Sequence, residues 1–81
     1  MLYISKDKIL RLVREIEKSL TDQTDVGNME RTYNDIRSMC NAERIDTHLL
    51  DVAFQSFTQD RGSIFAKKYL RRFITHILER N

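Results

Sequence analysis

Apolar residues recur along this chain at the spacing that lines one face of an α-helix. The first series is Ile9, Val13, Ile16 and Leu20, at i, i+4, i+7 and i+11. It predicts a helix over about residues 5–21, with Ser5 as its N-cap. Three later series are Met29, Tyr33, Ile36 and Cys40; Leu49, Leu50, Ala53, Phe54 and Phe57; and Ala66, Leu70, Phe73 and Ile77. They predict helices over about residues 28–41, 46–58 and 63–80.

Polar residues separate these segments. Turn formers cluster in TDQTDVGN, residues 21–28, and in TQDRGS, residues 58–63, where glycine and short polar side chains favour chain reversal. Asn28 and Asp46 each stand where a helix needs an N-cap. Amphipathic segments joined by short connections predict an all-α fold, a compact antiparallel bundle of about four helices that forms a single domain over residues 1–81.

The composition supports this fold class and bears on location. Of the 81 residues, 41% are hydrophobic and 32% are charged, with no proline and two glycines, which is typical of a soluble helical protein. No stretch approaches the about 18 apolar residues of a membrane-spanning helix, and the opening MLYI is too short for the apolar region of a signal peptide. A single cysteine precludes an internal disulfide, in keeping with a reducing compartment. We therefore expect a cytoplasmic protein.

The first connection superficially matches a calcium-binding loop. Asp22 and Gly27 fall at the first and sixth positions of an EF-hand, yet the fifth and twelfth positions, which supply ligands, hold Val26 and Tyr33. Valine has no ligand atom, and tyrosine is not the bidentate carboxylate that such a loop requires. The segment is therefore interpreted as a connection between helices.

No other residues form a recognisable metal-binding or catalytic constellation. Cys40, His48 and His76 are candidate ligands, but each belongs to a different predicted helix, and none of the close spacings of a zinc site joins them. Cys40 faces the predicted core, where a thiol is less reactive. The chain has no glycine-rich phosphate loop and no carboxylate pair placed for acid–base chemistry. We expect no metal, no cofactor, no catalytic residue and no enzymatic activity.

Charge is unevenly distributed along the chain. The net charge is only +2, but residues 61–80 hold six basic residues against one acidic residue, and residues 1–60 carry a balance of −3. Four of these cations fall within six positions: Lys67, Lys68, Arg71 and Arg72. On a helical wheel they lie opposite or beside the central apolar stripe of their helix, and the aromatic residues are expected to point away from them.

Several roles are open to this basic face. It can be an ordinary solvated helix surface, a docking site for an acidic protein surface, or a site that contacts nucleic-acid phosphates. Aromatics that point away from cations argue against base stacking, and the apolar first turn of this helix lacks the side chains with which a recognition helix reads bases. Self-association is a further alternative, with the acidic part of one copy against the basic helix of another.

The last predicted helix is also apolar beyond its central stripe. Phe65, Ile74 and Leu78 extend the apolar surface over more than half of its circumference, so the helix is either the central element of the bundle or part of an interface. We predict a small protein–protein interaction module, such as an inhibitor, adaptor, immunity or chaperone-like subunit; the alternative is a nucleic-acid-associated regulator. The candidate partner-binding residues are Phe65, Lys67, Lys68, Arg71, Arg72, Ile74 and Leu78.

Overall fold

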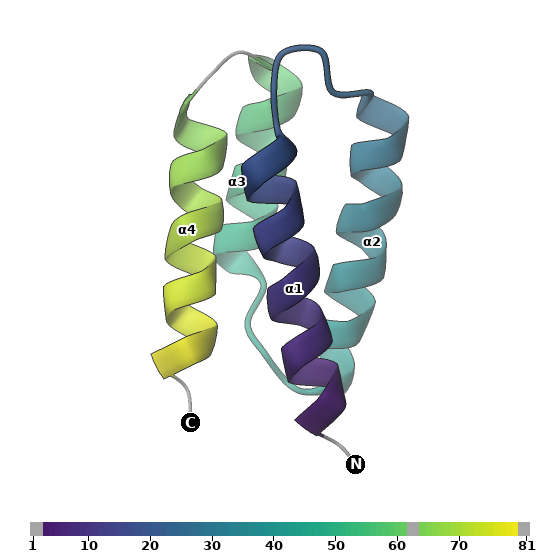
Figure 1. Ribbon diagram of the computed structural model, residues 1–81, viewed down its shortest axis with the longest axis vertical. Coiled ribbons are helices and arrows are strands. Elements are labelled where there is room, and N and C mark those ends of the chain that lie inside the picture. Colours follow the sequence, from purple (N-terminus) through teal and green to yellow (C-terminus); the bar gives the residue numbers. More distant parts are fainter. Residues whose placement is uncertain (1–2, 62–63, 80–81) are drawn as a thin grey trace.

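The computed structural model describes residues 3–61 and 64–79, and within these ranges all regular structure is helical. The helices are α1 (Tyr3–Ser19), α2 (Val26–Ala42), α3 (His48–Gln59) and α4 (Ile64–Glu79). Consecutive helices run antiparallel (Figure 1). The predicted all-α bundle is confirmed for the described part of the chain.

The helices are arranged as a ring. Each packs against two neighbours, α1 against α2 and α4, and α3 against α2 and α4. Within the described ranges the diagonal pairs, α1 with α3 and α2 with α4, make no comparable contact. Helix α4 is therefore one of the outer members, so the prediction that it could be the central element of the bundle is wrong.

The core is built from the predicted apolar series. The residues with less than a tenth of their surface exposed include Ile9, Val13, Leu20, Met29, Ile36, Cys40, Leu50, Ala53, Phe57, Ala66, Leu70, Phe73 and Ile77. Ile16, Tyr33, Leu49 and Phe54 are only partly buried and pack against this core. The helical period in the sequence thus places each inward face correctly, because one side of each helix must be removed from water.

The starts of α1 and α2 differ from the prediction. Helix α1 begins at Tyr3, so Ser5 lies inside the helix and is not its N-cap. Helix α2 begins at Val26 because Asp25, and not Asn28, is the cap. The Asp25 Oδ2 atom accepts a hydrogen bond from the Asn28 backbone amide at 2.9 Å. The cap that satisfies a free amide of the first turn thus stands three residues earlier than the sequence suggested.

The start of α3 shows a smaller shift. Thr47, and not Asp46, occupies the N-cap position, but its side chain makes no capping hydrogen bond. Asp46 still accepts from a first-turn amide, because its Oδ1 atom lies 3.2 Å from the His48 backbone nitrogen. The predicted start of the last helix at residue 63 and its predicted end at residue 80 lie outside the described residues.

The chain reverses direction at the end of α2, and Arg44 stands there at a position where glycine is usual. Arg44 has φ 58°, the left-handed conformation that costs a residue with a Cβ atom about 1 kcal/mol or more. Two hydrogen bonds close the turn, from the Ile45 amide to the Cys40 carbonyl at 2.8 Å and from the Arg44 amide to the Asn41 carbonyl at 3.2 Å. Ile45 and Cys40 are both buried. This burial and the two bonds offset the conformational cost at Arg44.

A side chain ties together the two connections at the opposite end. The α1–α2 and α3–α4 connections lie at the same end of the bundle in Figure 1. The Arg61 Nη1 atom donates to the Thr24 carbonyl oxygen at 2.9 Å. This bond fixes the entry to α2 relative to the exit from α3, and so helps to set the position of α4 beside both α3 and α1.

Candidate functional site

The outward face of α4 carries two rows of polar side chains at a spacing of four residues. One row is Lys68, Arg72 and His76, and the other is Arg71, Thr75 and Glu79. Together with Leu49 of α3, these side chains line an open groove of about 440 Å³. Since α4 packs against α3, Leu49 forms the wall of the groove in the first turn of the neighbouring helix.

The cations around this groove are held in different ways. The Arg71 Nε atom donates to Glu17 Oε2 of α1 at 2.8 Å, and the Glu17 side chain is only 17% exposed. The Arg72 guanidinium lies over the Tyr69 ring, 5.9 Å from its centroid. Lys67, Lys68 and Arg72 form no ion pair with a carboxylate in the described ranges. The face therefore presents positive charge that the described chain leaves uncompensated.

Two uncharged polar groups complete the lining of the groove. The Thr75 hydroxyl donates to the Arg71 carbonyl oxygen at 3.2 Å, so its oxygen is left as an acceptor. The His76 Nε2 atom is buried and has no hydrogen-bond partner among the described residues. A buried polar atom in this state costs about 1–3 kcal/mol. His76 therefore lines the groove with part of its side chain while its Nε2 atom is buried without a partner in the described ranges.

The predicted partner-binding residues do not all lie together. Lys68, Arg71 and Arg72 line the groove, whereas Ile74 is partly buried and packs against the core. Phe65 is 54% exposed and Leu78 is 46% exposed. These two are separated by about 140° around the helix axis and by about 20 Å along it. They therefore extend the exposed apolar surface at opposite ends of α4 and do not form one patch.

The predicted separation of aromatics from cations on α4 holds only in part. Phe73 is buried in the core. Tyr69, however, is only partly buried and carries Arg72 over its ring, so the expectation is wrong for this pair. On a wheel with 100° per residue, Phe65 falls on the same side of α4 as Tyr69 and Arg72. Of the aromatic residues of α4, Tyr69 is thus in contact with a cation of the groove, Arg72.

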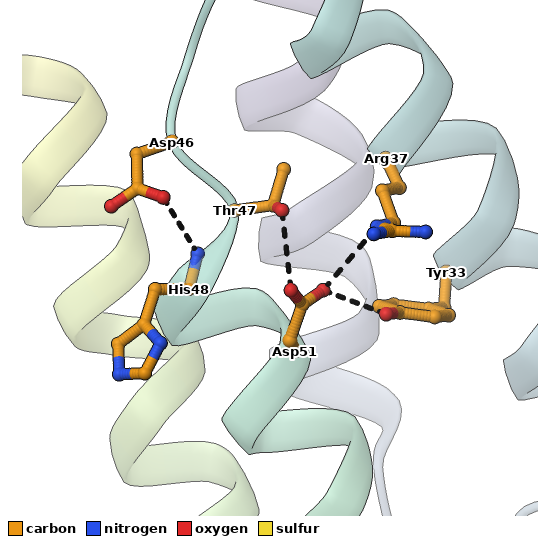
Figure 2. A network of polar contacts seen from close by, with 6 residues as sticks. All are labelled: Tyr33, Arg37, Asp46, Thr47, His48 and Asp51. Atoms are coloured by element: carbon orange, nitrogen blue, oxygen red, sulfur yellow. Dashed lines mark hydrogen bonds and ion pairs between the residues drawn. The ribbon is translucent and has the colours of Figure 1, made fainter.

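A second polar cluster joins α2 to α3 (Figure 2). The Asp51 carboxylate accepts from the Tyr33 hydroxyl at 2.6 Å and from the Thr47 hydroxyl at 3.3 Å, and it lies 3.6 Å from Arg37 Nε. The Tyr33 ring stacks on Phe54, with centroids 4.4 Å apart and planes 2° from parallel. We call the contact of α2 with α3 around Asp51 the Asp51 seam. The Asp51 carboxylate thus accepts two hydrogen bonds and forms one ion pair, all with side chains of the same chain.

Two groups at this seam hold their protons more tightly than usual. Burial and then the hydrogen bond to Asp51 raise the pKa of Tyr33. Burial, with a contribution from the Asp51 charge, raises the pKa of the Cys40 thiol to about 11. Because a nucleophilic cysteine must be a thiolate, the protonated thiol of Cys40 suits a core residue. The Asp51 seam is built to hold two helices together.

The three candidate metal ligands are not brought together. Cys40 is buried on α2, His76 lines the groove on α4, and the His48 side chain points away from the Asp51 seam (Figure 2). Among the described residues, no group of three or more histidine, cysteine, aspartate or glutamate side chains is placed to hold a metal ion.

In that same part of the chain, no helix has both the length and the apolar character needed to cross a membrane.

The outward face of α1 provides a contrast within the same molecule. A groove of about 470 Å³ there is lined by Asp7, Leu10, Arg11, Arg14, Glu15 and Lys18. Its size resembles that of the α4 groove, but it mixes two carboxylates with three cations at helical spacing. Such alternation is typical of a solvated helix face.

The sequence contained a signal for the α4 groove that its basic residues alone did not reveal. Lys68, Arg72 and His76 are four residues apart, which places them on one side of a helix. The wall of the groove, Leu49, belongs to another helix, and its place there depends on how α3 and α4 pack.

Comparisons with protein-family models, with curated proteins and with solved structures find no match to this chain.

Proposed function

We propose that this protein is a non-enzymatic interaction module of the cytoplasm that binds an acidic surface of a partner protein through the outward face of α4. Inhibitors, adaptors, immunity proteins and chaperone-like subunits work in this way. The observation that carries the proposal is the lack of any carboxylate paired with Lys67, Lys68 or Arg72 in the described ranges. An acidic surface would supply that complement, steer the encounter and fix the orientation of the partner.

Exposed apolar residues favour a protein as the partner. Ile64 is 76% exposed and Phe65 is 54% exposed at the start of α4, and Leu78 lies half exposed near its end. Burial of such side chains contributes about 25 cal/mol per Å² of apolar surface removed from water. A partner that covers the cations together with these residues gains apolar contact and charge pairing from one helix.

A second candidate function is binding to nucleic-acid phosphates through Lys67, Lys68, Arg71 and Arg72. The clustering of Lys68, Arg71 and Arg72 around one groove favours it, because clustered cations suffice for contact with phosphates. Glu79 weighs against it, since this carboxylate lines the same groove and repels a phosphate backbone. A protein partner remains the better match to the mixture of cations, apolar residues and one carboxylate.

The experiment compares two variants that lose the same charge from different faces. In K67Q/K68Q/R72Q the change is on α4, and in R11Q/R14Q/K18Q it is on α1. Each variant and the wild type are immobilised and exposed to nuclease-treated lysate of the source cells. We expect a protein that the wild type and the α1 variant retain and the α4 variant loses. Equal retention by all three would contradict the proposal.

Two further measurements separate the alternatives. Retention of an oligonucleotide by the wild type, with a salt dependence that the α4 changes flatten, would move the assignment to nucleic acid. Sedimentation of the purified protein at low and high salt tests whether the partner is a second copy. An oligomer that dissociates at high salt and is absent in the α4 variant would identify self-association.

A further inference from the structure

The α4 groove has features suited to one small, doubly charged anion. We propose that it is an oxyanion subsite that seats a phosphate group, so that the determinant recognised on the partner is a phosphorylated side chain. This inference rests on the proposed function, because it names the chemistry of the partner at the same surface. The steps below concern the lining residues Lys68, Arg71, Arg72, Thr75, His76, Glu79 and Leu49.

The lining of the groove leaves positive charge for an anion to meet. Arg71 is paired with Glu17 of α1, whereas Lys68 and Arg72, which line the same groove, form no ion pair in the described ranges. A phosphorylated serine or threonine carries about −1.5 to −2 at neutral pH, which matches these two cations. A carboxylate brings a single charge, so it would leave one of them uncompensated.

The donors left free by the described chain also suit a phosphate group. Arg71 uses Nε for Glu17, so its two terminal nitrogens keep their hydrogens for an oxyanion. The Arg72 side chain is already held over Tyr69. It therefore loses less conformational entropy when it binds an anion. Two guanidinium groups and the Lys68 ammonium line one groove, and a phosphate offers three oxygens to such donors, whereas a carboxylate offers only two.

The position of Glu79 defines an orientation along the groove. Lys68 and Arg72 are one turn apart, and Glu79 follows Arg72 by about 10 Å along the helix. In the complex the phosphate lies at the Lys68–Arg72 end. Glu79, at the other end, is then placed to meet a basic residue of the same partner segment. The site would thus distinguish a phosphorylated segment with a neighbouring cation from a uniformly acidic one.

The test begins with inorganic phosphate as the probe. Backbone amide resonances of the wild type are followed during titration with phosphate, and with chloride at equal ionic strength. We expect saturable shifts with phosphate only, centred on residues 68–79, and a loss of affinity of at least about tenfold in K68Q/R72Q. R11Q/R14Q removes the same charge and should bind phosphate as the wild type does. Shifts spread over both helix faces, or equal weakening by both variants, would overturn the proposal.

Peptides then separate phosphate recognition from attraction to acidic residues. One peptide carries a single phosphoserine, and a second carries glutamate in its place. We expect the phosphopeptide to bind at least about tenfold more tightly to the wild type. Equal binding of the two peptides would overturn the proposal.

The failure of this inference can be told apart from failure of the proposed function. Phosphatase treatment of the lysate should abolish retention of the partner. A partner still retained after phosphatase treatment, and still lost from K67Q/K68Q/R72Q, would sink the phosphate proposal while supporting an acidic protein partner. Retention that never depends on the α4 cations would instead count against the proposed function itself.

Discussion

The Asp51 seam and the outward face of α4 use charge in opposite ways. At the seam, the Asp51 carboxylate accepts from Tyr33 and Thr47 and lies beside Arg37, so its partners all belong to the chain. On α4, Lys67, Lys68 and Arg72 have no paired carboxylate in the described ranges. Groups matched within the chain contribute to its stability, whereas the unmatched cations are the basis of the binding role that we propose. Mutations in the two regions should therefore affect different measurements.

The largest expected effect is the loss of stability at alkaline pH through Cys40. The folded protein raises the pKa of this thiol from its ordinary value of 9.0 to about 11. Its contribution is fully present below pH 9 and is lost as pH rises through about 11, because the unfolded chain releases the proton first. Two pKa units correspond to about 3 kcal/mol.

The measurement is urea unfolding of the wild type and of Cys40→Ala at pH 8 and pH 11. The substitution lowers stability at pH 8, since it removes a buried atom. The decrease between the two pH values should nevertheless be smaller in Cys40→Ala by about 2 kcal/mol, because half of the folded molecules still keep the thiol proton at pH 11. An equal decrease in both proteins would show that the thiol is not held protonated by the fold.

The next effect comes from removing the centre of the seam. Asp51→Ala leaves the Tyr33 and Thr47 hydroxyls and the Arg37 guanidinium without their shared acceptor, so we expect a loss of about 2 kcal/mol in the free energy of unfolding. Asp35→Ala is the matched control, because Asp35 is an exposed carboxylate of α2. Thermal unfolding should show a clear decrease for Asp51→Ala and little change for the control. Phosphate binding on α4 should be unaffected by either.

Sequence periodicity predicted the helices and their inward faces because burial acts on each helix separately. The series from Ala66 to Ile77 is buried as expected, and its period needs no knowledge of neighbouring helices. The cap of α2 was misplaced because Asp25 and Asn28 are both good caps, and only the backbone geometry selects between them.

The period of apolar residues within a helix does not predict which side chains of different helices meet. Nothing near Tyr33 in the sequence indicates that its hydroxyl meets Asp51, eighteen residues away on another helix. The pairing of Arg71 with Glu17 joins residues even farther apart. The cations of the candidate site were visible as a cluster, but the wall supplied by Leu49 required the packing of α3 on α4. The spacing of side chains within α4 therefore indicates which residues of that helix lie together, but it does not predict that Leu49 of α3 completes the groove.

A smaller effect on stability, of opposite sign, is expected at Arg44, after the end of α2. The cause is the backbone conformation of this residue and not the charge of its side chain. Arg44→Gly removes the strain of the left-handed conformation and should stabilise the protein by about 1 kcal/mol. Arg44→Ala is the control, since it removes the same charge and keeps the strain. A higher thermal midpoint for glycine alone would assign the effect to the backbone. An equal gain in both variants would assign it to the charge.

The smallest effect on stability is expected from the residues for which we propose the largest role in binding. K67Q/K68Q/R72Q should change the free energy of unfolding by no more than about 0.5 kcal/mol, because none of these cations forms an ion pair in the described ranges and surface charges of this kind add little to folding. At low salt the change should be slightly stabilising, since mutual repulsion among the α4 cations is relieved, and it should vanish at high salt. Thermal unfolding at two salt concentrations measures this. A loss near that of Asp51→Ala would mean that these cations have partners within the fold, and the contrast with the Asp51 seam would disappear. A negligible change, together with lost partner retention, would show that this positive charge serves binding and contributes nothing to folding.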